Sequence, residues 1–276
     1  MFDVLIIDGP YLSHRSHDAP YTLTTSTGVD VTTIHSFLRS LKVLKNKFTP
    51  QTIYITWESH GTLSWRRHLY PSYKPSSPME NQYVTAVKEL QVILYLLGYK
   101  QCYAPNNEAD DVIATLCEKH SSDSVLIFTV DKDMMQLVDS RIKVYDGKIV
   151  FHVSDVKNKF GINPSQIPDF LAIKGDKSDN IKGIDGWGNK KTIKLLTKYK
   201  NVESIPMLEV FPGHDVKEML MLNKKLTLLN KKCNIVNIVP KTKYTLEELL
   251  DKYELKKIKE NLDEYKIKSK SIEEWF

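Results

Sequence analysis

Three short stretches of this chain carry clusters of carboxylates directly beside apolar segments. They are NNEADDVIATL at 106–116, TVDKDMMQLV at 129–138 and GDKSDNIKGIDGWGNKK at 175–191. Because a buried charge is costly unless it is neutralised, these clusters predict a bound cation. Carboxylate oxygens without a nearby histidine or cysteine favour Mg²⁺ or Mn²⁺ over Zn²⁺. Two such ions about 4 Å apart can activate water and stabilise a leaving oxygen, so hydrolysis of a phosphodiester is the predicted chemistry.

The elements that must position these acids alternate along the chain. Strand-like apolar runs occupy 3–8, 52–57, 124–130 and 142–146, and helical periodicity marks 32–48, 83–98 and 108–120. This alternation predicts an α/β fold with a parallel sheet. After about residue 160 short lysine-rich helical pieces follow, so we place a domain boundary between 1–160 and 161–276.

In such a sheet several acids would converge on one edge, because the carboxyl ends of parallel strands form the ligand-binding side. The acids that follow strand-like runs are Asp8, Glu58, Asp131 and Asp133. Glu108, Asp110 and Asp111 instead begin a helix, where capping of the helix N-terminus is the alternative role and the commoner one for such a trio by itself. The convergence of the other segments on the same edge favours the metal site.

The composition limits the class of protein. With 276 residues, 26% charged and 41% hydrophobic, the chain fits one large domain or a main domain with an appendage. No apolar run is long enough to cross a bilayer and the N-terminus lacks a signal-peptide pattern, so we expect a cytoplasmic protein. The three cysteines, Cys102, Cys117 and Cys233, are far apart and predict ordinary thiols. Lysines crowd 174–270, which favours a polyanionic partner, although a general abundance of lysine explains the net charge of +5 equally well.

The order of these motifs resembles that of the 5′-nuclease superfamily. Asp8 is followed by EADD at 108–111, VDKD at 130–133 and the glycine-rich stretch at 175–191. Flap endonucleases, phage 5′-to-3′ exonucleases with RNase H activity and the 5′-nuclease domain of bacterial DNA polymerase I belong to this superfamily. The resemblance covers roughly residues 1–200. It implies a PIN-like parallel sheet with helices on both faces, a helical arch inserted at about 60–82, and a helix-hairpin-helix element in a C-terminal helical region.

The resemblance also implies two groups of metal ligands, some of which would act through water. The first group would be Asp8, Glu58, Glu108 and Asp110, and the second Asp111, Asp131, Asp133, Asp176 and Asp179. Two Mg²⁺ ions are implied, with Mn²⁺ as a substitute. Glu58 stands where the family usually has Asp, and its longer side chain is expected to bind through water or to be slightly displaced.

The segment GTLSWRRHLYPSYKPSSPMENQ at 61–82 resembles the arch of this family. By that match Arg66, Arg67 and Lys74 would contact the scissile phosphate and its neighbours, and Tyr73 would stack on an unpaired base. The alternative is a solvated basic loop with Tyr73 packed beneath it. Family members often have an arginine shortly after the Tyr-Lys pair, whereas this chain has Ser76 and Ser77.

The stretch NIKGIDGWGNKK at 180–191 resembles the helix-hairpin-helix element, which grips the duplex backbone and holds a K⁺ ion on hairpin carbonyls. Its DNA-binding candidates are Gly183, Gly186, Gly188, Lys190 and Lys191. Glycines that allow a tight turn, followed by lysines at a helix N-terminus, are suited to binding phosphate. A plain surface turn is the alternative, and Trp187 is expected to be a core anchor.

The predicted function is a metal-dependent, structure-specific 5′-nuclease that acts on flapped, nicked or RNA-primed DNA, including RNA-DNA hybrids. A non-catalytic nucleic-acid binding module and a PIN-type ribonuclease are the alternatives. The final residues SKSIEEWF resemble sliding-clamp-binding peptides, with Ile272, Trp275 and Phe276 as anchors, and the alternative is that they pack on the protein's own helices. We expect a monomer in the cytoplasm, or in the host cytoplasm if a phage encodes it.

Overall fold

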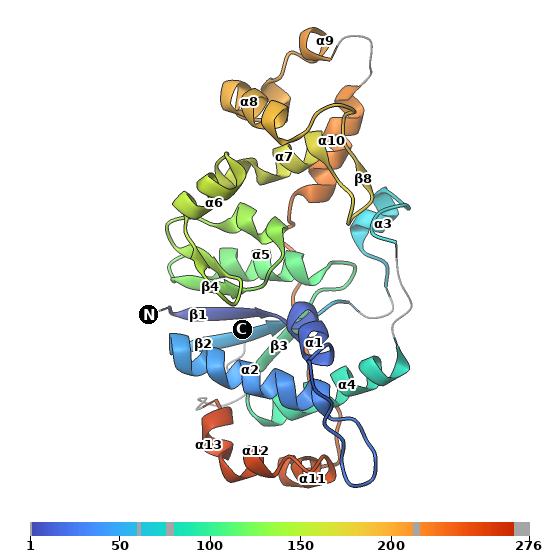
Figure 1. The fold of residues 1–276 in the computed structure, drawn as a ribbon, viewed down its shortest axis with the longest axis vertical. Coiled ribbons are helices and arrows are strands. Elements are labelled where there is room, and N and C mark those ends of the chain that lie inside the picture. The colour runs from blue at the N-terminus through green and yellow to red at the C-terminus, as the bar shows by residue number, and fades with distance from the viewer. Residues whose placement is uncertain (1, 60–61, 76–79, 212–215, 268–276) are drawn as a thin grey trace.

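The structure is a computed structural model, and it describes residues 2–59, 62–75, 80–211 and 216–267. A seven-stranded sheet lies at its centre, seen edge-on in Figure 1. Its strands are β1 Val4–Asp8, β2 Thr52–Thr56, β3 Lys100–Tyr103, β4 Val125–Phe128, β5 Ile142–Tyr145, β6 Val150–Phe151 and β9 Val236–Asn237. A separate hairpin is formed by β7 Gly175–Asp176 and β8 Ile181–Lys182.

The strand order β6-β5-β4-β1-β2-β3-β9 brings the acidic strand ends together. β1 pairs in parallel with both β2 and β4, and the registers place Asp8 opposite Thr56 and Ile7 opposite Phe128. The residues that follow β2 and β4 therefore emerge at the same edge as Asp8. The outermost strands β6 and β9 run antiparallel to their neighbours, so the sheet is mostly parallel, and the predicted α/β fold is confirmed.

Helices cover both faces of the sheet. Their bounds are α1 Gly9–His17, α2 Thr32–Phe48, α3 Trp65–Leu69, α4 Asn81–Leu96, α5 Ala109–Lys119, α6 Val153–Phe160, α7 Ile167–Lys174, α8 Asn189–Tyr199, α9 Met207–Val210, α10 Val216–Thr227, α11 Leu246–Lys252, α12 Lys256–Glu260 and α13 Leu262–Tyr265. Short 3₁₀ helices lie at η1 Lys132–Leu137, η2 Pro164–Gln166 and η3 Val202–Ser204.

Side chains of β1 alternate between two cores because successive residues of a strand point to opposite faces. Leu5 and Ile7 join the core with α2 and α4, whereas Val4 and Ile6 join the core with α5, η1 and α7. In α2 the apolar residues recur at three- and four-residue spacing, which gives the helix one buried face. Burial on both faces fixes the sheet as a rigid platform for its acidic edge.

The part of the chain beyond residue 160 occupies two places. α7, α8 and α10 lie above the α5 side of the sheet, with the β7–β8 hairpin beside α3 (Figure 1). The last helices, α11 to α13, instead return to the α2 and α4 face, where the Tyr99 hydroxyl donates to the Tyr265 carbonyl at 2.8 Å. Among the described residues, no helix has the length and apolar character that crossing a membrane requires. The anchors Ile272, Trp275 and Phe276 lie outside the described residues.

Candidate active site

Asp8 is the acid at the centre of the sheet edge. It is 5% exposed, and its Oδ2 accepts a hydrogen bond from Thr129 Oγ1 at 2.6 Å while its Oδ1 accepts from the Tyr11 amide at 3.0 Å. Burial and the charge of Asp131 raise the pKa of Asp8 to about 6, against the lowering effect of these hydrogen bonds. Thr129 thus holds the carboxylate in one orientation, and its hydroxyl also accepts from the Asp131 amide at 3.1 Å.

Glu58 and Asp110 share this electrostatic environment. Burial raises the pKa of Glu58 to about 7, with Glu108 and Asp8 adding to the rise and the Lys74 ammonium opposing it. Burial also raises the pKa of Asp110 well above its ordinary value, and the charge of Asp131 is the next cause. These carboxylates therefore repel one another in a partly desolvated site, which is the condition that a bound cation relieves.

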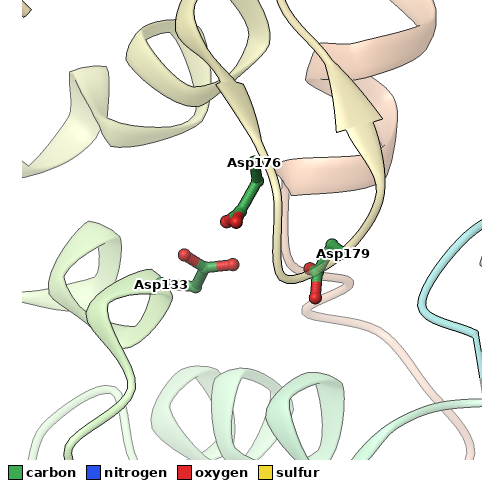
Figure 2. A group of neighbouring side chains, drawn as sticks. All are labelled: Asp133, Asp176 and Asp179. Carbon is green, nitrogen blue, oxygen red and sulfur yellow. The ribbon is translucent and has the colours of Figure 1, made fainter.

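A second group contains Asp133, Asp176 and Asp179, which come from η1, β7 and the turn after β7. One carboxylate oxygen of each lies within 4.8 Å of the others, and Figure 2 shows the Asp133 and Asp176 carboxylates directed toward one another. Asp133 Oδ1 is buried and accepts no hydrogen bond from the described residues. Burial and the charge of Asp131 raise the pKa of Asp133 to about 8. Asp176 Oδ2 also accepts no hydrogen bond from the described residues, although the Lys132 ammonium pairs with it. Three converging carboxylates with two such oxygens fit a hard divalent cation.

Two of the predicted site residues, Arg66 and Asp111, have a different role in the structure. Arg66 is 2% exposed and Asp111 is completely buried, and they form a two-pronged ion pair with N–O distances of 2.7 and 2.8 Å. Asp111 Oδ1 also accepts from the Asn230 amide and Oδ2 from the Trp65 indole. Both Asp111 oxygens are already used in a closed network, which favours a structural role over the predicted metal binding. The Arg66 guanidinium is enclosed by protein, which likewise favours a structural role over the predicted contact with phosphate.

Arg66 instead ties the base of the arch to other parts of the molecule. Its Nη1 donates to Glu108 Oε2 at 2.8 Å, and its Nε and Nη2 donate to the carbonyls of Leu226 and Leu228 at 2.7 and 3.2 Å. The guanidinium therefore joins α3, the start of α5 and the end of α10. Every donor direction is filled, as a buried guanidinium requires.

Tyr73 is buried at 3% exposure and packs with Ile181 and Leu226, which favours the packed position over the predicted stacking on a base. Its hydroxyl lies 3.0 Å from Asp179 Oδ2 and 3.2 Å from Glu108 Oε2. The packed position was the alternative expected from the sequence. Tyr73 therefore bridges one acid of each candidate metal group.

Lys74 and Arg67 remain accessible at the mouth of the acidic edge. The Lys74 side chain is 45% exposed and its Nζ lies 3.6 Å from Glu108 Oε1. Burial would lower the pKa of Lys74, but the charges of Glu108, Asp110 and Glu58 outweigh it and raise that pKa. The Lys74 amide donates to the Asp179 carbonyl at 2.9 Å, which fastens this end of the arch to the β7–β8 turn. Arg67 Nη2 donates to the Lys74 carbonyl, so the Arg67 guanidinium reaches the backbone at Lys74.

The hairpin residues divide between structural and accessible positions. A Cβ atom on Gly183 would lie 2.1 Å from the Lys174 carbonyl, so this glycine is required by the close approach of the chain at β7 and β8. Gly186 has φ +76°, a conformation that favours glycine in the turn. Gly188 caps α8, whose first turn presents Lys190 and Lys191 to solvent. Trp187 packs against the core with its ring 4.8 Å from that of Phe211, as expected.

Sequence reasoning missed two residues beside the acids, Thr129 and Lys132. Thr129 is completely buried at the end of an apolar strand, where a polar side chain needs a partner. Lys132 stands between two aspartates, and its Nζ lies 2.7 Å from Asp176 Oδ2 and 3.9 Å from Asp133 Oδ1. Both residues lie within TVDKD, beside Asp131 and Asp133, but their closest carboxylates, Asp8 and Asp176, come from distant parts of the chain.

Comparison with known proteins agrees with this geometry. A family model described as the 5′-3′ exonuclease N-terminal resolvase-like domain matches residues 3–161, and one described as the 5′-3′ exonuclease C-terminal SAM fold matches residues 162–261. The chain is 35% identical over 280 aligned residues to a 5′-3′ exonuclease of Aquifex aeolicus, covering 98% of this chain and 94% of that protein.

Two solved structures share the fold. T5 5′-exonuclease with bound zinc ions superposes with a TM-score of 0.69 at 20% identity, covering 95% of this chain and 99% of that chain. The bacteriophage T5 flap endonuclease in a pseudo-enzyme-product complex with DNA and metal ions gives a TM-score of 0.65 at 18% identity, covering 95% and 98%. At these identities the likeness concerns the fold alone.

The fold and the acidic edge define a nuclease of the 5′-nuclease superfamily. Within it, the chain belongs to the 5′-3′ exonuclease family. It is a metal-dependent 5′-nuclease and so an enzyme that hydrolyses phosphodiesters, which confirms the activity predicted from the motif order. Divalent metal dependence also agrees with the cluster of Asp133, Asp176 and Asp179.

Proposed function

We propose that this 5′-nuclease cleaves flapped, nicked or RNA-primed DNA, with RNase H activity on RNA-DNA hybrids, and that it uses two Mg²⁺ ions for which Mn²⁺ can substitute. One observation carries the proposal. Carboxylates that end β1, that follow β2 and β4, that begin α5 and that lie in the β7–β8 turn are close enough to influence one another's charge. The partly exposed Lys74 lies beside them, and exposed lysines follow the β7–β8 hairpin. Such an arrangement suits a substrate that combines a reacting phosphate with a duplex.

The residues that would hold the ions form two groups, and Asp111 belongs to neither of them. They are Asp8, Glu58, Glu108 and Asp110 in the first, and Asp131, Asp133, Asp176 and Asp179 in the second. When bound, the ions supply an activated water and charge stabilisation for an in-line displacement at phosphorus. Lys74 would hold the scissile phosphate, since its ammonium lies 3.6 Å from a first-group acid and faces solvent. Arg67 would contact a neighbouring phosphate.

The hairpin and α8 would hold the duplex backbone. The first turn of α8 offers unpaired amides and the side chains of Lys190 and Lys191 to a phosphate. The superposition with the T5 complex, which contains DNA, supports a branched duplex as the partner. A K⁺ ion on the hairpin carbonyls belongs to the same proposal, as does a tail at Ile272, Trp275 and Phe276 that binds a sliding clamp. We further propose that the protein works as a monomer in the cytoplasm.

A cleavage panel tests this function. The full chain is incubated with end-labelled flap, nicked duplex, blunt duplex, RNA-DNA hybrid and single-stranded RNA, each with Mg²⁺, Mn²⁺ or EDTA. We expect cleavage near the 5′ end of the branched, nicked and hybrid substrates, and none in EDTA. Asp131→Asn and Asp179→Asn should abolish cleavage but retain DNA binding, because they remove ligand charge without touching the lysine contacts. Near wild-type turnover in either variant, or cleavage of single-stranded RNA alone, would contradict the proposal.

A further inference from the structure

Lys132 is the cation most closely associated with the second carboxylate group. Its Nζ lies 2.7 Å from Asp176 Oδ2 and 3.9 Å from Asp133 Oδ1, and 3.5 Å from the Ser178 hydroxyl. Asp176 Oδ1 is already bound by the Ser178 amide and hydroxyl at 3.0 and 2.6 Å. The ammonium thus approaches the two oxygens that point into the group, where the candidate divalent ion would bind.

The Lys132 ammonium offsets part of the negative charge of this group but does not satisfy all of its carboxylate oxygens. Asp133 Oδ1 accepts no hydrogen bond from the described residues, and its closest cation is the Lys132 ammonium at 3.9 Å. An ammonium has three donors and no fixed geometry, whereas a divalent cation binds several oxygens at about 2.0–2.6 Å. One positive charge also leaves the three acids of the group incompletely compensated. The carboxylate oxygens of this group are therefore better suited to a divalent cation than to the Lys132 ammonium.

The surroundings of Lys132 allow it to leave. Its side chain is 40% exposed and lines an open groove together with Lys177 and Gly186. Its aliphatic stem is flexible, and the ammonium needs only rotation about single bonds to move from Asp176 into this groove. The enclosed guanidinium of Arg66, held by five hydrogen bonds, has no such route.

We propose that Lys132 is an exchangeable internal counter-ion: it pairs with Asp176 and Asp133 while no divalent ion is bound there, and it moves into the groove when one binds. This inference rests on the proposed assignment of the second metal group. It makes Lys132 a competitor of the metal, so the intrinsic affinity of the carboxylates is higher than the affinity the protein displays. It also means that metal binding delivers a free ammonium to the groove beside the hairpin.

Direct measurement of metal binding tests the exchange. Mn²⁺ is titrated into the metal-free full-length protein, and free Mn²⁺ is followed by its electron paramagnetic resonance signal. Lys132→Gln should bind Mn²⁺ roughly 3- to 10-fold more tightly at the second site, since a partly exposed charged hydrogen bond no longer has to be broken. Lys132→Arg should bind no more tightly than wild type, because it keeps the competing charge.

Lys177→Gln is the matched control, because Lys177 is an exposed lysine of the same groove and next to Asp176 in the chain. It removes the same charge, and among the described residues no carboxylate lies within 4.0 Å of its ammonium. Its Mn²⁺ affinity should stay within about twofold of wild type. If Lys132→Gln and Lys177→Gln bound Mn²⁺ more tightly by the same factor, the gain in affinity would come from the general loss of positive charge, and the inference would be overturned.

Thermal unfolding supplies a second readout. In EDTA, Lys132→Gln should melt below wild type, because Asp176 and Asp133 then lack their counter-charge. Saturating Mn²⁺ should raise the melting temperature of Lys132→Gln by more than it raises that of wild type. Unchanged or weaker Mn²⁺ binding by Lys132→Gln, while wild type binds normally, overturns this inference alone. Failure of wild type to bind Mn²⁺, or an unchanged stoichiometry in Asp179→Asn, overturns the metal assignment as well.

Discussion

Replacing Arg66 should destabilise the protein far more than replacing its neighbour Arg67. Both arginines belong to α3, but Arg66 is 2% exposed and pairs with two buried acids, while Arg67 is partly exposed and its guanidinium donates to the Lys74 carbonyl. Arg66→Met leaves Asp111 buried without its counter-charge and leaves Glu108 with the Lys74 ammonium, 3.6 Å from its Oε1, as its cation. Breaking a buried pair in this way costs about 3–5 kcal/mol.

The size of the expected melting shift follows from the length of the chain. A globular protein of 276 residues has an unfolding entropy of about 0.6 kcal/mol per kelvin. A loss of 3–5 kcal/mol therefore lowers the melting temperature by roughly 5–9 °C. Arg67→Met, as a surface change, should cost about 0.5 kcal/mol or less, which corresponds to about 1 °C.

Thermal and urea unfolding of both variants in EDTA measures these differences without a contribution from metal. A double-mutant cycle identifies the source: Asp111→Asn should destabilise the wild type strongly but the Arg66→Met variant much less, because the pair is already broken. Equal stability of the two arginine variants would refute the structural role of Arg66. Additive effects of Arg66→Met and Asp111→Asn would refute the pairing as its cause.

Three further predictions concern the site and the tail. Lys74→Ala should slow single-turnover cleavage more than it weakens duplex binding, whereas Lys190→Ala should mainly reduce affinity and its salt dependence; identical profiles would contradict the separation of roles. Asp133 has a raised pKa of about 8 in the folded protein against about 3.8 unfolded, so its contribution to stability is complete below pH 3.8 and is lost as the pH rises to 8. In EDTA the melting temperature should fall between pH 6 and 8.5, and Asp133→Asn should flatten that fall; an unchanged slope would exclude this acid as its source. Deleting residues 271–276 should abolish clamp-stimulated cleavage at unchanged melting temperature, and a large fall in melting temperature without a clamp effect would instead show that the tail is part of the core.

The sheet could be predicted from sequence where its strands are buried on both faces. VLIID and VLIF are continuous apolar runs, and the structure places them as β1 and β4 at its centre. β3 was missed because its four residues, KQCY, mix charged, polar and aromatic side chains. Gln101 is nevertheless completely buried, where its amide bonds the Gln91 carbonyl and its carbonyl accepts from the Trp57 indole. Pairings of this kind depend on tertiary contacts and leave no periodic signal.

The position of the acids was predictable, but their partners were not. Residues at the ends of parallel strands must share an edge, so Asp8 and Asp131 could be placed together from the pattern alone. The pairing of Arg66 with Asp111 spans 45 positions and is completed by the backbone of residues 226–230. Nothing in the sequences EADD and SWRR distinguishes an acid that binds a metal from one that pairs with a guanidinium. For the same reason the packed position of Tyr73 could be named only as an alternative, since its burial depends on Leu226.

The kind of cation beside each acid gives a physical rule for separating these roles. Arg66 offers a rigid fork that satisfies Asp111 completely inside the protein, so no metal can compete for those oxygens without leaving a buried guanidinium unpaired. Lys74 and Lys132 are partly exposed ammonium groups on flexible stems, and each lies against a carboxylate from one of the two candidate metal groups. Lysine can exchange its carboxylate for a phosphate or for water at small cost, because its charge remains solvated throughout the movement. We therefore expect Asp176 and the Glu108 Oε1 oxygen, which lie beside lysines, to keep their charge available to a metal. Asp111 and the Glu108 Oε2 oxygen, which pair with Arg66, instead hold the arch to the start of α5.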